Sequence, residues 1–106
     1  MILCDMARIN QIYPIDVRDA LHALGDRIVI ARKAAGLRQS DLADRAGVSR
    51  STLVEIGKGS PHVAMGNYLA VLWALDLLAD VDKIAMFESD SHRLMADQLP
   101  KRVRKG

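Results

Sequence analysis

The sequence predicts an all-α protein, and three observations lead to that prediction. Half of the 106 residues are apolar but only four are aromatic, so the core must be built mainly from aliphatic side chains. There are only three prolines, and β-branched residues show little alternation. From residue 16 onward, apolar residues recur at steps of three and four, which is the period of an α-helix. We expect a compact domain of five helices that forms a dimer.

The first expected helix covers residues 16–35, and its last residue is followed by Gly36, which suits the left-handed conformation that ends many helices. Gly25 lies off the apolar stripe of this helix, where a glycine weakens the helix without removing a core residue. One long helix and a helix broken near Gly25 both remain open. The expected inward stripe consists of Val17, Leu21, Leu24, Ile28, Ala31 and Ala35.

Two short helices are expected next, within residues 37–59. The second helix spans Gln39 to Ala46 and the third spans Arg50 to about Ile56, with Gly47 in the connection between them. Ser49 precedes the third helix, where its hydroxyl can accept a hydrogen bond from a free backbone N–H. Small or apolar residues are expected to hold the pair together, namely Leu42, Ala43, Ala46, Val48, Leu53 and Ile56.

The fourth helix is expected at residues 65–75 and the fifth at 77–87. The fourth is apolar on more than one side, and so small a domain has too little core to bury all of it. In the fifth, Leu78, Val81 and Ala85 fall on one side. We therefore expect these two helices to form the interface of a homodimer, with Val71, Trp73, Leu78 and Val81 in it.

The two ends of the chain flank this domain, which we place at residues 16–87. Residues 1–15 are expected to be an N-terminal arm in which Ile9, Ile12 and Tyr13 can dock on a neighbour. Residues 88–106 form a C-terminal tail, and residues 101–105 hold four basic side chains in five positions. That tail is a solvated segment, a source of nonspecific attraction to DNA, or a contact for an acidic partner.

Two short helices joined through a glycine form the helix-turn-helix arrangement, whose second helix enters the major groove of DNA. In this pattern Arg50, Ser51, Thr52 and Glu55 point outward from the third helix. Arg50 can pair with guanine and Glu55 can accept from a cytosine amine, whereas the two hydroxyls accept several partners. The alternative for Arg50 and Glu55 is that each is a solvated surface charge.

The stretch LRQSDLADRAGVSRSTLVEIGKG resembles the Cro/cI-type repressors, also called the xenobiotic-response-element family. The matching residues are Gln39, Leu42, Ala43, Ala46, Gly47, Val48, Ser49, Leu53, Ile56 and Gly59. The resemblance implies a lambda-repressor-like fold and double-stranded DNA, with a palindromic operator, as the partner. It also implies base reading by Arg50, Ser51 and Glu55. Phosphate binding is expected of Arg38, Gln39, Ser49 and Lys58.

The chain departs from the family pattern at two places. Arg38 stands where members often have a capping Ser, Thr or Asn, and its side chain has no acceptor for a backbone N–H. Gly57 stands where many members have a Glu that pairs with an Arg matching Arg32. Without that partner, Arg32 is expected either to contact DNA or to be solvated.

A narrower resemblance involves the chain ends. The segments NQIYP, residues 10–14, and LPKRVR, residues 99–104, together with the apolar fourth helix, are similar to HipB-type antitoxins. Those proteins repress their own operon and bind a HipA-type kinase toxin. The alternatives are a stand-alone phage or metabolic repressor and a protein-interaction module that has lost DNA binding.

Other classes find no support in the sequence. There is no Gly-rich phosphate loop or metal-binding pair, so we expect no enzyme, no catalytic residue, no metal and no cofactor. Cys4 is the single cysteine, which excludes an internal disulfide and suits a cytoplasmic protein. No apolar run approaches the length of about 20 residues that spans a bilayer, and no signal peptide is expected.

Overall fold

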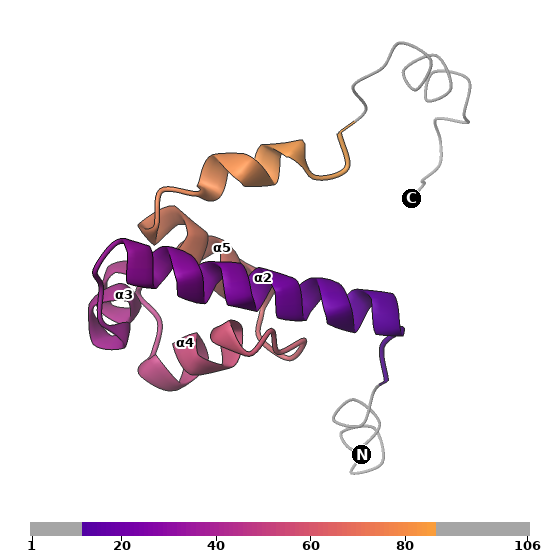
Figure 1. Ribbon diagram of the computed structural model, residues 1–106, viewed down its shortest axis with the longest axis horizontal. Helices are drawn as coiled ribbons and strands as arrows, with labels where there is room; N and C mark the ends of the chain where they lie inside the picture. The colour runs from indigo at the N-terminus through magenta and orange to yellow at the C-terminus, as the bar shows by residue number, and fades with distance from the viewer. Residues whose placement is uncertain (1–11, 87–106) are drawn as a thin grey trace, which may run out of the picture.

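The computed structural model of the chain describes residues 12–86, and these residues form four α-helices and a 3-10 helix without any strand. The predicted all-α fold class is thereby confirmed. The elements are α2 (Ile15–Ala34), α3 (Gln39–Ala46), α4 (Arg50–Gly57), α5 (Met65–Ala74) and η1 (Leu78–Lys83) (Figure 1). The expectations for Cys4, Ile9, the end of the fifth helix at residue 87 and the basic tail lie outside the described residues.

The longest element, α2, is a continuous helix of 20 residues that follows Pro14. The break considered near Gly25 does not occur, and Gly25 is one of the two buried residues of α2. The inward stripe is shorter than expected, because Val17 is 41% exposed and Ala35 lies beyond the last turn. Val17 lies in the part of α2 that precedes its crossing with α4.

The core is formed by one apolar cluster to which every α-helix contributes. Leu42, Ile56 and Val71 are its largest fully buried side chains, one from each of α3, α4 and α5. Ile28 from α2 is 2% exposed and joins them. The core positions expected in α3 and α4 are confirmed, with Leu42, Ala43, Leu53 and Ile56 buried and Ala46 and Val48 packed against them.

The fifth helix differs from the expectation of an α-helix over residues 77–87. It is a 3-10 helix of six residues, Leu78–Lys83, without buried residues. The chain leaves α5 through Asp76, whose φ is 62°, and Ala85, two residues after η1, has a φ of 61°. Two left-handed residues so close together leave no room for a long α-helix.

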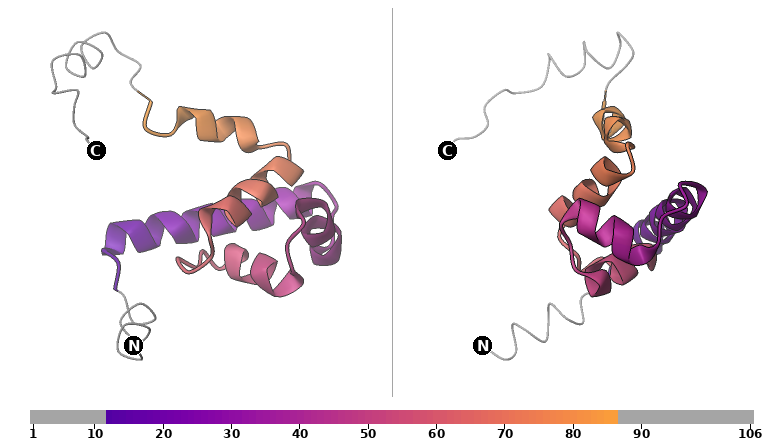
Figure 2. Two further views of the ribbon diagram at one scale, coloured as in Figure 1. Left: turned by 180° about the vertical axis from the view of Figure 1, so that it is seen from behind. Right: turned by 90° about the vertical axis from the view of Figure 1, so that its left-hand side faces the viewer.

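The closely packed pairs of elements are α3 with α5, α2 with α4, α3 with α4, and α5 with η1. Seen from behind, α5 crosses α2 and η1 continues from its end (Figure 2). Between residues 12 and 86, no helix combines the length and apolarity needed to cross a membrane. In the same range, no three His, Cys, Asp or Glu side chains are grouped to hold a metal ion.

Candidate nucleic-acid interface

The turn between α3 and α4 is the feature that sets the angle of these two helices. Gly47 ends α3 with a φ of 72°, a left-handed conformation that glycine adopts at little cost. The N–H of Val48 then donates to the carbonyl of Ala43 at 3.0 Å, which satisfies an acceptor at the end of α3. Only three residues, 47–49, separate the end of α3 at Ala46 from the start of α4 at Arg50.

The first turn of α4 is held by hydroxyl groups. The Ser49 Oγ accepts from the backbone N–H of Thr52 at 3.1 Å and donates to the Thr52 Oγ1 at 2.9 Å. The Ser51 hydroxyl lies 3.1 Å from the same Ser49 oxygen. These hydroxyls therefore stabilise the start of α4, and Ser49 has the capping role expected for it.

The outer face of α4 presents charged and polar side chains to solvent. Arg50, Ser51, Glu55 and Lys58 are all exposed, whereas Thr52 is half-buried. The Lys58 ammonium lies 3.6 Å from the Glu55 carboxylate, with side chains 68% and 50% exposed. An ion pair this open to water contributes little to stability, so both groups remain available to other partners.

The start of α3 is held by a carboxylate rather than by its N-cap side chain. The backbone N–H of Arg38 donates to Asp41 at 2.9 Å, and the Arg38 guanidinium lies 3.2 Å from the same carboxylate. The hydrogen bond from this guanidinium, followed by that from the backbone N–H, lowers the pKa of Asp41. The pairing raises the pKa of Arg38 in turn. Arg38 thus precedes α3 with its charge paired, and Gln39, the first residue of α3, is half-buried.

Arg32 corrects an expectation. It was expected to contact DNA or to be solvated, but its Nη1 donates to the backbone carbonyl of Leu37 at 2.6 Å. This bond joins the last turn of α2 to the loop before α3. Gly57, at the place of the family's Glu, faces Val29, because a Cβ there would lie 3.1 Å from the Val29 Cγ2.

The close crossing of α2 with the end of α4 depends on glycines, and this role was not predicted from the sequence. A Cβ at Gly25 would lie 2.7 Å from the Gly57 carbonyl oxygen and 2.8 Å from the Gly59 nitrogen. Gly59 has a φ of 74°, and a Cβ there would collide with the Leu21 carbonyl. The backbones thus meet without side chains between them. The signal in the sequence was a glycine inside a long helix, which often marks close packing.

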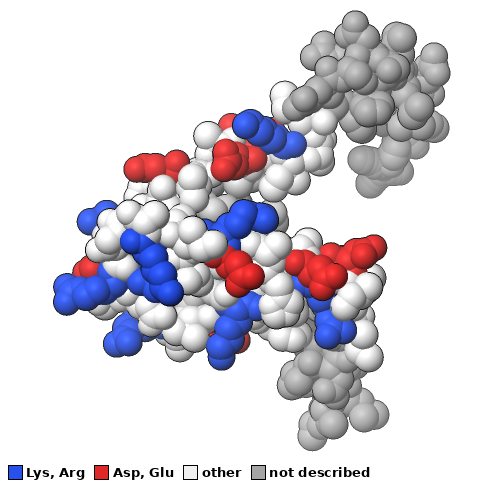
Figure 3. Space-filling model, viewed as in Figure 1, with Lys and Arg blue, Asp and Glu red and all other residues white. Residues whose placement is uncertain are grey.

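Charge is distributed unevenly over the described surface. Residues 32–58 hold six basic and three acidic side chains, whereas the remaining described residues hold three basic and six acidic ones. In Figure 3 the basic side chains gather around α3, α4 and the end of α2, and acidic ones lie over η1 and the start of α2. The basic part of the surface is therefore the part that carries α4.

The four residues expected in a dimer interface do not share one environment. Val71 is fully buried in the core of the single chain, so it presents no surface to a partner, which corrects that expectation. Trp73 is 59% exposed and Leu78 38% exposed, while Val81 is half-buried. The exposed apolar side chains therefore lie beside Val71 along α5 and η1, and Met65 and Ile84 join them.

Two short helices at a glycine turn, with a polar outer face on the second, define a helix-turn-helix protein. In agreement with this geometry, the model of the helix-turn-helix domain family matches residues 23–82, which is more than half of the chain. The chain belongs to this family, whose domains are typical of DNA-binding transcription regulators and of the Cro/cI-like group. A comparison with curated proteins gave no match.

Proposed function

We propose that the chain is a sequence-specific DNA-binding repressor that binds a palindromic operator as a homodimer. The observation that carries the proposal is the exposed outer face of α4, which lies within the basic part of the surface. A helix presented in this way fits the major groove of DNA. When the operator overlaps a promoter, the bound protein blocks access to the promoter and so represses transcription. Two such helices in a dimer are placed about 34 Å apart, one turn of DNA.

Each residue of the face has a distinct proposed role. Arg50 makes a bidentate contact to guanine, and Ser51 and Thr52 add less specific hydrogen bonds. Glu55 accepts from cytosine after exchanging its contact with Lys58, which then binds a phosphate. Arg38, Gln39 and Ser49 bind phosphates at the starts of α3 and α4, where helix N-termini favour anions.

Fluorescence anisotropy tests this proposal directly. The full chain is titrated with labelled DNA from upstream of its own gene and with a scrambled duplex, each at two salt concentrations. We expect tighter binding to the native sequence and a fall in affinity with salt that reflects phosphate contacts. Replacement Arg50→Ala is expected to cost about 1–3 kcal/mol on the native sequence and little on the scrambled one.

Arg18→Ala is the matched control, because Arg18 is an exposed arginine near the start of α2 rather than on α3 or α4. This control should bind the native sequence as the unmodified chain does. Base reading by Arg50 is supported if the Arg50→Ala variant binds both duplexes equally while Arg18→Ala keeps the preference for the native sequence. If the unmodified chain fails to prefer its own upstream DNA, selected binding sites from random sequence test whether it prefers any sequence.

A finer form of the proposal makes the protein an antitoxin that also binds a HipA-like kinase toxin. It is supported by the similarity of the chain ends to HipB-type antitoxins, and most of those residues lie outside the described range. The test is co-expression with the product of the neighbouring gene, followed by purification through a tag on the toxin. Absence of a kinase-like neighbour and of a stable complex would leave the stand-alone repressor.

A further inference from the structure

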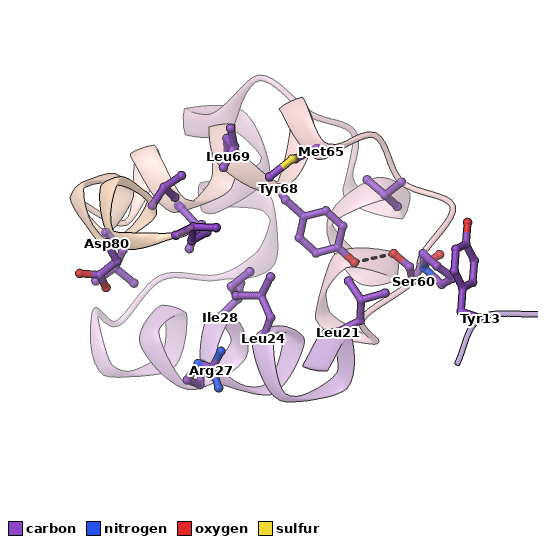
Figure 4. A pocket seen from close by; sticks show the side chains of 16 residues that line it. Tyr13, Leu21, Leu24, Arg27, Ile28, Ser60, Met65, Tyr68, Leu69 and Asp80 are labelled. Carbon is purple, nitrogen blue, oxygen red and sulfur yellow. Dashed lines mark hydrogen bonds between the residues drawn. The ribbon is translucent and has the colours of Figure 1, made fainter. Parts of the chain in front are cut away.

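An apolar groove lies between α2 on one side and α5 and η1 on the other. It has a volume of about 690 Å³ and is lined by residues of α2, α5 and η1 and of the loop before α5. Figure 4 shows Leu24 and Ile28 of α2 on one side and Leu69 and Tyr68 of α5 on the other. The volume falls within the range of about 300–1,000 Å³ that is usual for sites of small organic ligands.

The groove exists because of how the helices pair. α2 packs against α4 and α5 packs against α3, whereas η1 packs against α5. Between α2 and the unit formed by α5 and η1, side chains such as Leu24, Leu69 and Val81 are therefore only half-buried. An apolar occupant would remove this surface from water, which is favourable by about 25 cal/mol per Å².

The charges of the groove define the chemistry of the occupant. Of the sixteen described residues that line it, two are charged, Arg27 on α2 and Asp80 on η1 (Figure 4). Neither forms an ion pair with another described residue. Arg27 lines the groove from α2 and is exposed, so its charge is available to an anion. Asp80 disfavours a second negative charge on the same ligand.

We propose that this groove is a binding site for a small amphipathic monoanion, with its apolar body between α2 and α5 and its anionic group at Arg27. The class includes medium-chain monocarboxylates, whose apolar chain can lie along the wall between Arg27 and the loop at Ser60. This assignment is independent of DNA binding and stands on the shape and charge of the groove. It places Val81 in the groove wall rather than in the homodimer interface expected for it.

The position of the site also links it to the candidate nucleic-acid interface. Tyr68, in the groove wall, donates to the carbonyl of Ser60 at 2.6 Å, and the N–H of Ser60 donates to the Glu55 carbonyl at 3.0 Å. Leu21, also in the wall, contacts Gly59 through its backbone. A ligand would thus touch the elements that hold the end of α4, and an effector role for it rests on the proposed repressor function.

The test is a titration of the full chain, without DNA, by isothermal calorimetry and by two-dimensional NMR. Three probes of matched chain length are used: decanoate, decylammonium and decanedioate. We expect saturable binding of one decanoate per chain, with shift changes clustered at Leu24, Leu69 and Val81, and weaker binding of the other two probes. Arg27→Gln should weaken decanoate by about threefold, as for a partly exposed ion pair. Arg18→Gln, an exposed arginine of the same helix outside this groove, should leave it unchanged.

Several outcomes would overturn the proposal. These are absence of saturable decanoate binding, shift changes outside the groove, and binding of decylammonium as tight as that of decanoate. If a second copy of the chain covers the groove instead, the NMR signals of the groove residues should shift when the protein is diluted, and decanoate should have no effect on them. Since no DNA is present, a negative result here leaves the repressor proposal untouched, and loss of DNA binding leaves the ligand site untouched.

Discussion

Gly25 of α2 and Gly57 of α4 approach so closely that a Cβ on Gly25 would lie 2.7 Å from the Gly57 carbonyl oxygen. The contact is between backbones, which cannot move aside as a flexible side chain does. It holds the C-terminal end of α4 against the middle of α2. The orientation of the helix that carries Arg50 and Glu55 therefore depends on the absence of a side chain at residue 25.

Gly25→Ala is expected to destabilise the protein by about 1–3 kcal/mol, the range for overpacking a tight contact. Urea unfolding followed by circular dichroism measures the change. Gly66→Ala is the matched control, because Gly66 is also helical but has no atom within 4 Å of the added Cβ. There the better helix propensity of Ala should stabilise by up to about 1 kcal/mol. Equal effects at both positions would contradict the role of the crossing.

Asp41→Asn is expected to remove an acid-sensitive part of the stability. The pKa of Asp41 is lowered in the folded state, so its contribution is present above the unfolded pKa and is lost as the pH falls through the folded one. The unfolding free energies of the two proteins should therefore differ at pH 7 and converge towards pH 2. Asp44→Asn, on the same helix and exposed, should show a smaller difference at pH 7. A pH-independent gap for Asp41→Asn would argue against the pairing with Arg38.

Tyr68→Phe is expected to cost about 1 kcal/mol at pH 7, because the Ser60 carbonyl loses its 2.6 Å hydrogen bond. Burial, followed by the charge of Glu55, raises the pKa of Tyr68, so the stability it contributes is full below its unfolded pKa. That contribution is lost as the pH rises through the folded pKa. Urea unfolding at pH 7 and above pH 10 measures both effects. If the difference in unfolding free energy between the unmodified chain and Tyr68→Phe does not become smaller at high pH, the predicted pKa effect is contradicted.

Trp73→Glu is expected to weaken self-association, because Trp73 is a large apolar side chain that α5 leaves 59% exposed. Sedimentation equilibrium over a range of protein concentrations measures the dimer constant. Ile30→Glu is the control, since Ile30 is 65% exposed on α2 outside the expected interface. The homodimer proposal predicts at least about a tenfold weaker dimer for Trp73→Glu alone, corresponding to about 1.4 kcal/mol. A monomer at all concentrations of the unmodified chain would refute it.

The sequence by itself determined the helices of the DNA-binding motif. The starts of α3 and α4, the glycine turn at Gly47 and the core positions of Leu42 and Ile56 follow from residues a few positions apart. Capping, helix period and turn conformation are local properties, because each depends on neighbours along the chain. For that reason these elements could be predicted to within a residue or two.

The tertiary structure decided the features that depend on residues far apart in sequence. The contact of Gly25 with the end of α4 could not be predicted from the sequence, because the two are about thirty residues apart. The hydrogen bond from Arg32 to the Leu37 carbonyl likewise depends on the path of the loop after α2. Val71 was expected at a dimer interface because its helix is apolar on more than one side, and periodicity cannot say which side of such a helix meets the core. Val71 is buried because α5 packs against α3, and this contact cannot be predicted from residues that are close together in sequence.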